Sequence, residues 1–140
     1  MIILDTNVLS EPLRKNPNVS VVEWIDSQNL DTLFITTITL AEMHFGMESL
    51  PNGRRKDTLL SRLSSEILPL FRGRILPFDI DAAKSYGALM SRAQSNGFAI
   101  SAADGFIAAI ATSCSMKVAS RDTNPFKATE LEVINPWELQ

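Results

Sequence analysis

The chain has 140 residues, 45% of them apolar, which suffices for one hydrophobic core and predicts a single domain over residues 1–140. Its net charge of -3 excludes a protein that is basic throughout, although the segment from Arg54 to Arg74 carries six basic and two acidic side chains. No apolar stretch approaches the roughly 20 residues that cross a bilayer, so we expect a cytoplasmic protein with no membrane contact. The single cysteine, Cys114, excludes an internal disulfide, and we expect it in the core.

The first ten residues, MIILDTNVLS, combine a buried strand with a polar turn. Residues 1–4 are apolar on both faces, which is typical of a strand inside a parallel sheet. Asp5 follows at once, and a short helix is expected over residues 7–14, with Pro12 limiting its regularity. Asp5 lies where ligands bind in open α/β sheets, but a helix-capping role fits this position equally well.

Helices and strands continue to alternate after this start. A helix is expected to begin near residues 18–20, and residues 33–35 form a second short buried strand. The helix that follows carries a core-facing stripe at helical spacing, formed by Leu40, Met43, Met47 and Leu50. Glu42 lies off this stripe, in the first turn. A Pro-Asn-Gly turn ends the helix, and the basic segment then forms an antiparallel partner, so that the two make a hairpin that could supply a subunit interface.

The second half of the chain shows the same alternation. Asp79 is a plausible N-cap for a helix whose buried face carries Ala83, Tyr86, Met90 and Ala93. A helix of small residues opens at Ser101, where alanines and Gly105 allow a close approach to the sheet. Residues 117–119 and 132–134 form the last two strands. Strands separated by helices predict an α/β fold with a central parallel sheet and helices on both faces.

Four carboxylates follow strand ends in this scheme: Asp5, Glu42, Asp104 and Asp122. Each has a structural alternative, since Thr39-x-x-Glu42 and Ser101-x-x-Asp104 are capping-box patterns and Asp122 can form an Asx turn. Taken singly, the structural alternatives are favoured. Right-handed crossovers, however, bring such positions to one edge of a parallel sheet, so the conjunction of all four favours a functional site.

Clustered carboxylates repel one another, and a divalent cation relieves that repulsion. Mg²⁺ and Mn²⁺ prefer oxygen ligands and retain water molecules. Such sites promote in-line attack of water on phosphodiesters without a histidine or serine nucleophile. The pattern therefore favours metal-dependent phosphodiester hydrolysis.

Several strings then occur in order along nearly the whole chain: LDTNVLSEPLR, TTITLAEMHFGMESLPNG, ILPLFRGRILPFD, ISAADGFIAAIA, VASRDTNPF and INPW. In these strings the chain resembles the PIN-domain ribonucleases, and among them the VapC toxins of FitB type. The resemblance implies a three-layer α/β/α PIN fold and an Mg²⁺- or Mn²⁺-dependent endoribonuclease. Asp5 and Asp104 would be the principal metal ligands, and Glu42 and Asp122 would complete the catalytic set.

The resemblance also implies supporting roles and partners. Thr6, Asn7 and Thr123 match positions that hold water or acids in place. Many PIN toxins carry TRNxxDF after the fourth strand, whereas this chain has SRDTNPF, so Asp122 is the least typical ligand. Such toxins pair with a small antitoxin, bind promoter DNA through it, and form homodimers.

Rival functions remain open at this stage. A non-catalytic PIN-like module would bind RNA or a partner through the basic segment, with Arg54, Arg55 and Lys56 as contacts. A receiver domain needs an acidic pair after the first strand and a late lysine, and a haloacid-dehalogenase phosphatase needs an aspartate where Asn7 stands. The sequence therefore favours the nuclease.

Overall fold

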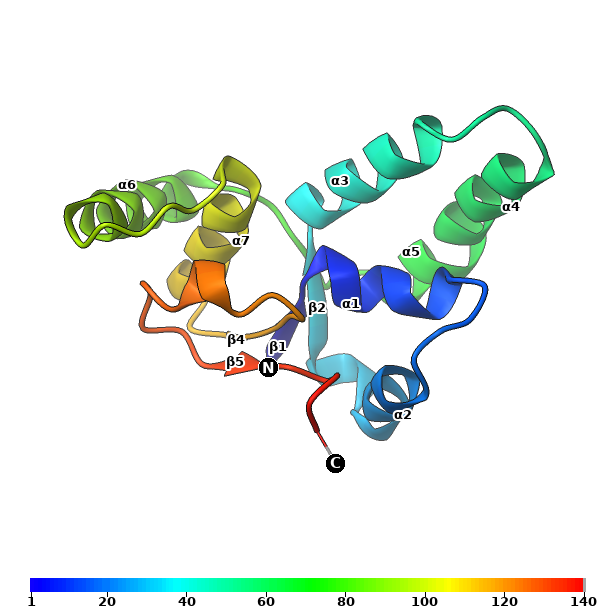
Figure 1. Cartoon of the computed structure of the whole chain (residues 1–140), viewed down its shortest axis with the longest axis horizontal. Coiled ribbons are helices and arrows are strands. Elements are labelled where there is room, and N and C mark those ends of the chain that lie inside the picture. Colours follow the sequence, from blue (N-terminus) through cyan, green and yellow to red (C-terminus); the bar gives the residue numbers. More distant parts are fainter. Residues whose placement is uncertain (140) are drawn as a thin grey trace.

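The computed structural model describes residues 1–139, and its centre is a parallel sheet with the strand order β3-β2-β1-β4-β5 (Figure 1). The strands are β1 (Ile2–Leu4), β2 (Leu33–Thr36), β3 (Ile75–Leu76), β4 (Lys117–Ala119) and β5 (Val133–Ile134). Within β1, Ile3 pairs with Phe34 of β2 on one side and with Val118 of β4 on the other. The N-terminal strand is therefore the middle one, and the residue after it lies at the centre of the carboxyl edge.

Helices cover both faces of this sheet, so the expected three-layer α/β/α architecture is confirmed (Figure 1). One face carries α1 (Thr6–Ser10), α2 (Val19–Ser27), α3 (Thr37–Glu48), α4 (Arg54–Arg62) and the short α5 (Leu68–Leu70). The other face carries α6 (Ile80–Ser95) and α7 (Ala102–Ser113).

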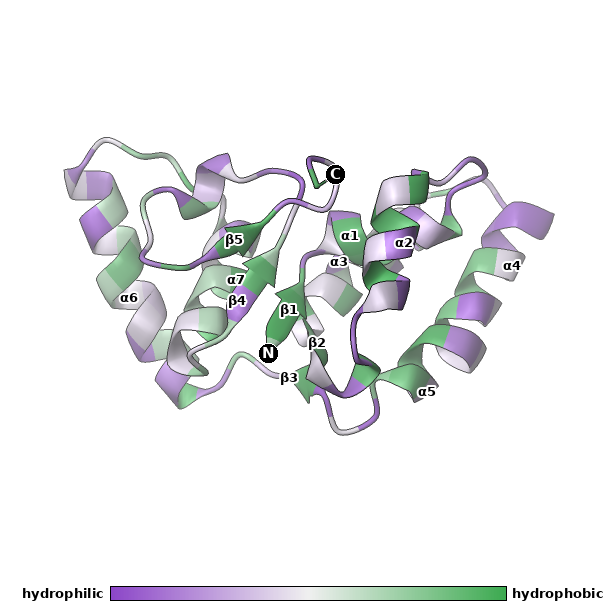
Figure 2. Cartoon of the chain, turned by 90° about the horizontal axis from the view of Figure 1, so that it is seen from below, coloured by the Kyte–Doolittle hydropathy of each residue, from purple (hydrophilic) through white to green (hydrophobic). Residues whose placement is uncertain are grey.

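Two hydrophobic cores lie on the two faces of the sheet. Successive side chains of a strand point to opposite faces. Accordingly, Ile2 and Leu4 join the core with Val8 of α1, whereas Ile3 joins the core with Ile107 of α7. In Figure 2 the strands are mostly hydrophobic, and hydrophilic residues lie mainly on helices and loops. The sheet is therefore buried on both faces, which explains why its strands are continuous apolar runs.

The helix starts explain where the site residues lie. Asn18, Asp79 and Ser101 cap α2, α6 and α7, as predicted. The helix expected over residues 7–14 is shorter: α1 ends at Ser10, and a 3-10 helix, Glu11–Leu13, contains Pro12. Proline cannot donate a backbone hydrogen bond, which accounts for the change of helix type.

The basic segment forms the antiparallel partner of α3, but it is not one regular helix. After α4 the chain makes a π-helical turn, Leu63–Ile67, before α5. Leu59 and Leu63 are buried and join this hairpin to the core. These leucines therefore anchor the hairpin of α3 and α4, which Figure 1 shows at one side of the sheet.

Several local expectations were wrong. The two-residue strand β3 was not predicted, because so short a run carries no periodicity. On α6 it is Ala82 rather than Ala83 that is buried, and Leu89 joins the buried face. Cys114 caps the C-terminal end of α7 and is exposed, not a core residue.

Gly105 makes its close approach to α6, not to the sheet. A Cβ atom at this position would lie 2.8 Å from Met90 Sδ and 3.0 Å from Tyr86 Cε2. The residue is buried in the first half of α7, directly after Asp104. Among residues 1–139, no helix is long and apolar enough to span a bilayer.

Candidate functional site

Asp5 stands at the carboxyl end of the central strand, and its carboxylate is fixed by two hydrogen bonds. The Thr6 backbone N–H donates to Oδ1 at 2.8 Å, and the Ser120 hydroxyl donates to Oδ2 at 2.7 Å. The residue is only 5% exposed. A helix-capping carboxylate ordinarily accepts from the second or third helical residue, whereas Thr6 is the first. Asp5 therefore caps α1 through the first helical residue, and its carboxylate lies at the carboxyl edge of the sheet.

Burial is the main influence on the ionisation of Asp5. Loss of solvation raises its pKa to about 6, and the charges of Asp104 and Glu42 add to that rise, against the lowering effect of the bonds from Ser120 and Thr6. At neutral pH the group is an anion held in an unfavourable environment. Two of the three other predicted acids are thus close enough to act on Asp5, and Asp122 is not among the charges that raise its pKa.

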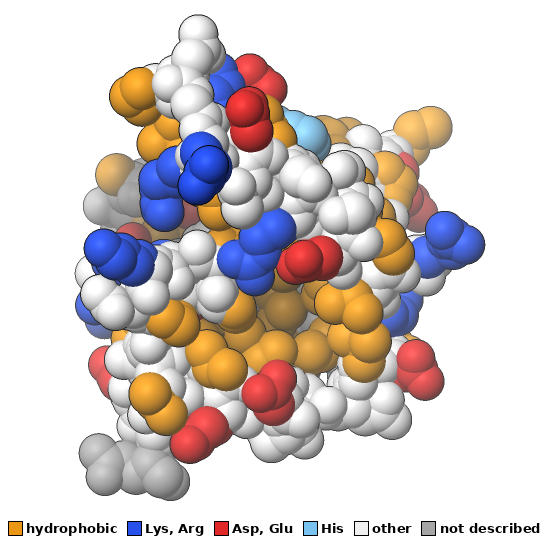
Figure 3. All heavy atoms as spheres, turned by 90° about the vertical axis from the view of Figure 1, so that its right-hand side faces the viewer, with side chains coloured by type: hydrophobic (Ala, Val, Ile, Leu, Met, Phe, Trp, Pro, Cys, Tyr) orange, Lys and Arg blue, Asp and Glu red, His pale blue; other side chains and the backbone are white. Residues whose placement is uncertain are grey.

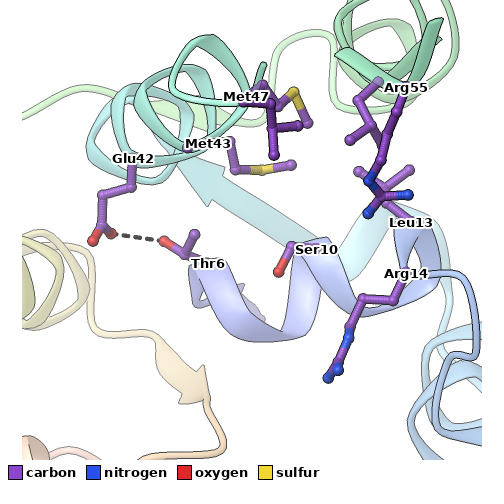
Figure 4. Close-up of a pocket in the computed structure, with 11 residues that line it drawn as sticks. Thr6, Ser10, Leu13, Arg14, Glu42, Met43, Met47 and Arg55 are labelled. Atoms are coloured by element: carbon purple, nitrogen blue, oxygen red, sulfur yellow. Dashed lines mark hydrogen bonds between the residues drawn. The ribbon is translucent and has the colours of Figure 1, made fainter. Parts of the chain in front are cut away.

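Glu42 lies in the second turn of α3, not the first. Thr36 caps this helix by accepting from the Thr39 N–H at 3.1 Å, so the capping-box interpretation of Glu42 was wrong. Instead, the Thr6 hydroxyl donates to Glu42 Oε1 at 2.7 Å, as Figure 4 shows. Thr6 therefore joins α1 to α3 and holds the second acid beside the first.

Asp104 lies in the first turn of α7 and is half-buried. Its backbone N–H donates to Ser101 Oγ at 3.2 Å, and the Ser101 hydroxyl lies 2.9 Å from Asp104 Oδ2. The predicted cap at Ser101 is confirmed. The carboxylate keeps its second oxygen, Oδ1, for other partners.

Asp122 is exposed in the turn after β4, and the predicted Asx turn is confirmed by its bond from the Asn124 N–H at 3.2 Å. Asn7 ties this turn to α1, because its Oδ1 accepts from the Arg121 N–H at 3.2 Å. Thr123 is half-buried at the start of the 3-10 helix Asn124–Phe126 and makes no side-chain capping bond. The structure therefore places the Asp122 carboxylate in its own turn and does not show it acting on Asp5.

Ser120 is a site residue that the sequence reasoning missed. It is fully buried, and its hydroxyl lies 2.7 Å from Asp5 Oδ2 and 3.1 Å from the Asp122 carbonyl oxygen. Asn7 Nδ2 donates to the same Oγ at 3.4 Å. A small polar residue directly after a buried strand was the available signal, since it joins the same edge as the residue after β1.

We call the four predicted acids, Asp5, Glu42, Asp104 and Asp122, the acidic edge; the charges of Glu42 and Asp104 act on the pKa of Asp5, whereas Asp122 is not among the groups that do. Within residues 1–139 no Lys or Arg forms an ion pair with any of the four. No three His, Cys, Asp or Glu side chains of the described chain already lie in a metal-holding arrangement. Within residues 1–139, Glu42 and Asp104 each accept a hydroxyl hydrogen bond, and Asp122 accepts from a turn amide. All the donor atoms of these side chains are nevertheless oxygens, and no Lys or Arg of the described chain neutralises their negative charge by an ion pair. Both properties fit a hard divalent cation.

The basic residues proposed from the sequence do not share one environment. Lys56 pairs with Glu48 at 3.5 Å, and its side chain is only 15% exposed. Arg55 instead lines a cavity of about 280 Å³ together with Thr6 and Glu42 (Figure 4). Arg54 lies in a neighbouring hollow with Arg55. The structure therefore separates Lys56 from the two arginines.

Comparison with known proteins places this geometry in context. The family model described as PIN domain matches residues 2–131. The chain is 49% identical to VapC ribonuclease Y4jK of Sinorhizobium fredii, covering 99% of each chain. It is 51% identical to Toxin FitB of Neisseria gonorrhoeae, covering 98% of this chain and 99% of that one. A solved structure of FitAB bound to an IR36 DNA fragment superposes with a TM-score of 0.96 at 51% identity, covering 100% and 98% of the two chains.

Proposed function

The chain belongs to the PIN-domain family, and on this basis we propose that it is an endoribonuclease and the toxin of a type II toxin–antitoxin pair. Its relatives are named as a ribonuclease and as a toxin, and each is matched over almost its full length. We propose in addition that residues 1–140 form one domain, since both cores share the same sheet.

The observation that carries the proposal is the state of Asp5. A buried carboxylate with a raised pKa, acted on by two further acids, has no cationic partner among the described side chains. A structural cap needs none of this. An edge that holds negative charge without compensation is suited to binding a divalent cation.

We assign the cation as Mg²⁺ or Mn²⁺, with Asp5 and Asp104 as its principal ligands and Glu42 and Asp122 completing the set. When bound, such an ion lowers the pKa of water and stabilises charge on a phosphodiester in the transition state. Glu42 and Asp104 each accept a side-chain hydroxyl through one carboxylate oxygen, and we propose that the second oxygen of each binds the cation.

The protein's own part is to orient these groups. The Ser120 hydroxyl and the Thr6 amide fix both oxygens of Asp5, so this carboxylate presents its remaining lone pairs in one direction. The Thr6 hydroxyl keeps Glu42 beside it, and Asn7 holds the loop that carries Asp122.

We propose Thr123 as a further supporting residue and Arg54 and Arg55 as substrate contacts. Lys56, which the sequence grouped with these arginines, is paired with Glu48, and we do not assign it to RNA.

The partners follow from the relatives. We propose a cognate antitoxin that inhibits this chain, binding of promoter DNA through that antitoxin, and a homodimer of the toxin, in keeping with the FitAB complex on DNA. RNA is the substrate, which implies a cytoplasmic site of action.

Expression with and without the neighbouring upstream reading frame tests this function. We expect growth arrest when the chain is expressed alone and relief when the neighbour is co-expressed. The matched control is Asp5→Asn, which should express without arrest. An Asp5→Asn protein that arrests growth as strongly as the wild type would instead favour the non-catalytic binding module. Sequencing of RNA ends after arrest would identify the cleaved RNA.

A further inference from the structure

Two segments far apart in the sequence bring basic side chains together around one hollow of about 530 Å³. Its cations are Arg14 and Lys15, which follow the 3-10 helix Glu11–Leu13, and Arg54, Arg55 and Arg62 of α4. We call this surface the basic hollow. Figure 3 looks onto the side of the molecule that carries α4 and shows Lys and Arg side chains grouped there. Its floor is apolar, formed by Leu13 and Leu59.

Most of this charge is not compensated. Arg14 pairs with Glu11 at 3.4 Å and Arg62 with Glu66 at 3.1 Å. Lys15, Arg54 and Arg55 have no acidic partner among residues 1–139, and none of the residues lining the hollow is acidic. The hollow is therefore a local positive field on a chain whose net charge is -3.

The basic hollow adjoins a cavity that reaches one acid of the acidic edge, Glu42. Arg14, Arg55 and two leucines line both the hollow and the cavity of about 280 Å³ that reaches Thr6 and Glu42. Figure 4 shows Glu42 and Thr6 at one end of that cavity and the two arginines at the other. Between them the wall is mostly apolar, with Met43 and Met47 projecting from α3.

We propose that a single strand of RNA lies along this path, with backbone phosphates in the basic hollow and an unpaired base against the methionine wall. The proposal rests on the nuclease function and adds to it the direction in which substrate leaves the acidic edge. Arginine binds phosphate through paired N–H donors, which suits the hollow. An apolar cavity of this size accepts a base only when that base is unstacked, as in single strands and loops.

The test measures binding of a labelled oligouridine of about 12 nucleotides in the Asp5→Asn background, so that the RNA stays intact. The combined variant Lys15→Ala, Arg54→Ala, Arg55→Ala should weaken binding at least tenfold at about 100 mM salt, and should reduce the salt slope by about 2, from about 0.7 per phosphate contact. Lys56→Ala is the matched control, because Lys56 is adjacent in sequence but paired with Glu48. It should leave affinity and slope unchanged.

Three outcomes would overturn the inference. One is an unchanged slope in the combined variant, and another is an equal loss in Lys56→Ala. The third is intact RNA binding together with loss of binding to the co-expressed antitoxin, which would assign the hollow to a protein partner. A duplex of the same length should bind more weakly than the single strand, and equal affinity would contradict the unpaired-base contact.

Cleavage assays separate this inference from the function on which it rests. With Asp5 present, the combined variant should raise KM about tenfold and leave kcat within about twofold, since within residues 1–139 the substituted side chains make no hydrogen bond or ion pair with Asp5. If the wild-type protein cleaves no RNA, the proposed function fails. If it cleaves RNA and the combined variant keeps the wild-type KM, only the basic hollow is refuted.

Discussion

The acidic edge and the basic hollow are joined by a cavity that Glu42 and Arg55 both line, but the two regions are built in opposite ways. Asp5 is 5% exposed and held by two hydrogen bonds, and Glu42 and Asp104 each have a hydroxyl partner. Lys15, Arg54 and Arg55 are exposed and make no ion pair among the described residues. The difference teaches that the acids are held in place by hydrogen bonds, whereas the basic side chains are exposed and supply positive charge without a fixed partner.

The largest effect should come from removing the fixed anion. Asp5→Asn should lower RNA cleavage at least about 100-fold, as expected when one preorganised charged group is removed from a site. Purified wild type and variant are compared by cleavage of the same RNA with Mg²⁺, and circular dichroism confirms that the fold is kept. Cleavage within about twofold of wild type would show that Asp5 is dispensable, and the acidic edge would then not be the catalytic region.

The pH dependence of stability tests the unfavourable charge directly. In the unfolded chain the pKa of Asp5 is near the ordinary aspartate value of 3.8, whereas in the folded chain its pKa is about 6. The proton bound by the folded state therefore stabilises it fully below about pH 4, and this contribution of up to about 3 kcal/mol disappears as the pH rises through 6.

Urea unfolding in EDTA at pH 4.5 and 7.5 measures this change. Asp5→Asn should not show this component of the pH dependence, so the difference between variant and wild type isolates the contribution of one residue. An identical pH dependence in the two proteins would mean that Asp5 is not the group responsible.

Ser120→Ala should have a smaller effect on cleavage, about tenfold, because it removes one charge-assisted hydrogen bond to Asp5. That bond lowers the pKa of Asp5, so its loss should also shift the stability change in EDTA to higher pH. Ser120→Thr restores a hydroxyl and should recover part of both effects. A loss of cleavage with no shift in the pH dependence would indicate a packing role instead.

Asp104→Asn removes one of the charges that raise the pKa of Asp5. Without metal it should raise the melting temperature at pH 7.5 by a few degrees, corresponding to about 0.5–1 kcal/mol. A clear fall in melting temperature would instead support a capping role with Ser101.

Substitutions in the basic hollow should have the smallest effect on stability. Arg54→Ala and Lys15→Ala should change the free energy of unfolding by less than about 0.5 kcal/mol, because both side chains are exposed and unpaired within residues 1–139. Urea unfolding checks this. A larger loss would show that the hollow is as rigidly built as the acidic edge.

The sequence predicted that Glu42 lies near Asp5, and parallel topology explains why. The two residues follow the buried strands β2 and β1, whose carboxyl ends meet at one edge of the sheet. Asp122 also follows a strand, β4, but it is not among the charges that raise the pKa of Asp5. The hollow instead depends on how the loop after residue 13 packs against α4, and no local pattern records that contact. For the same reason the sequence grouped Lys56 with Arg55, although their side chains lie in different environments.

The start of α3 shows that the sequence also left a local choice open. Thr36, Thr37 and Thr39 are all plausible starts for α3, and the choice of Thr36 moved Glu42 from the first turn to the second. Ser120 was overlooked because its position directly after a strand, taken alone, does not distinguish a site residue from an ordinary turn residue. Its importance appears only when β4 pairs with β1 and the hydroxyl meets Asp5.

The central position of β1 bears on how the protein is made. The Asp5 carboxylate and the Ser120 hydroxyl are 115 positions apart, yet they are direct hydrogen-bond partners. A ribosome must therefore release most of the chain before the first strand can be flanked on both sides. Nascent or prematurely terminated products that lack β4 would contain Asp5 without its partner. Synthesis itself thus delays the appearance of an enzyme that is harmful to its own cell.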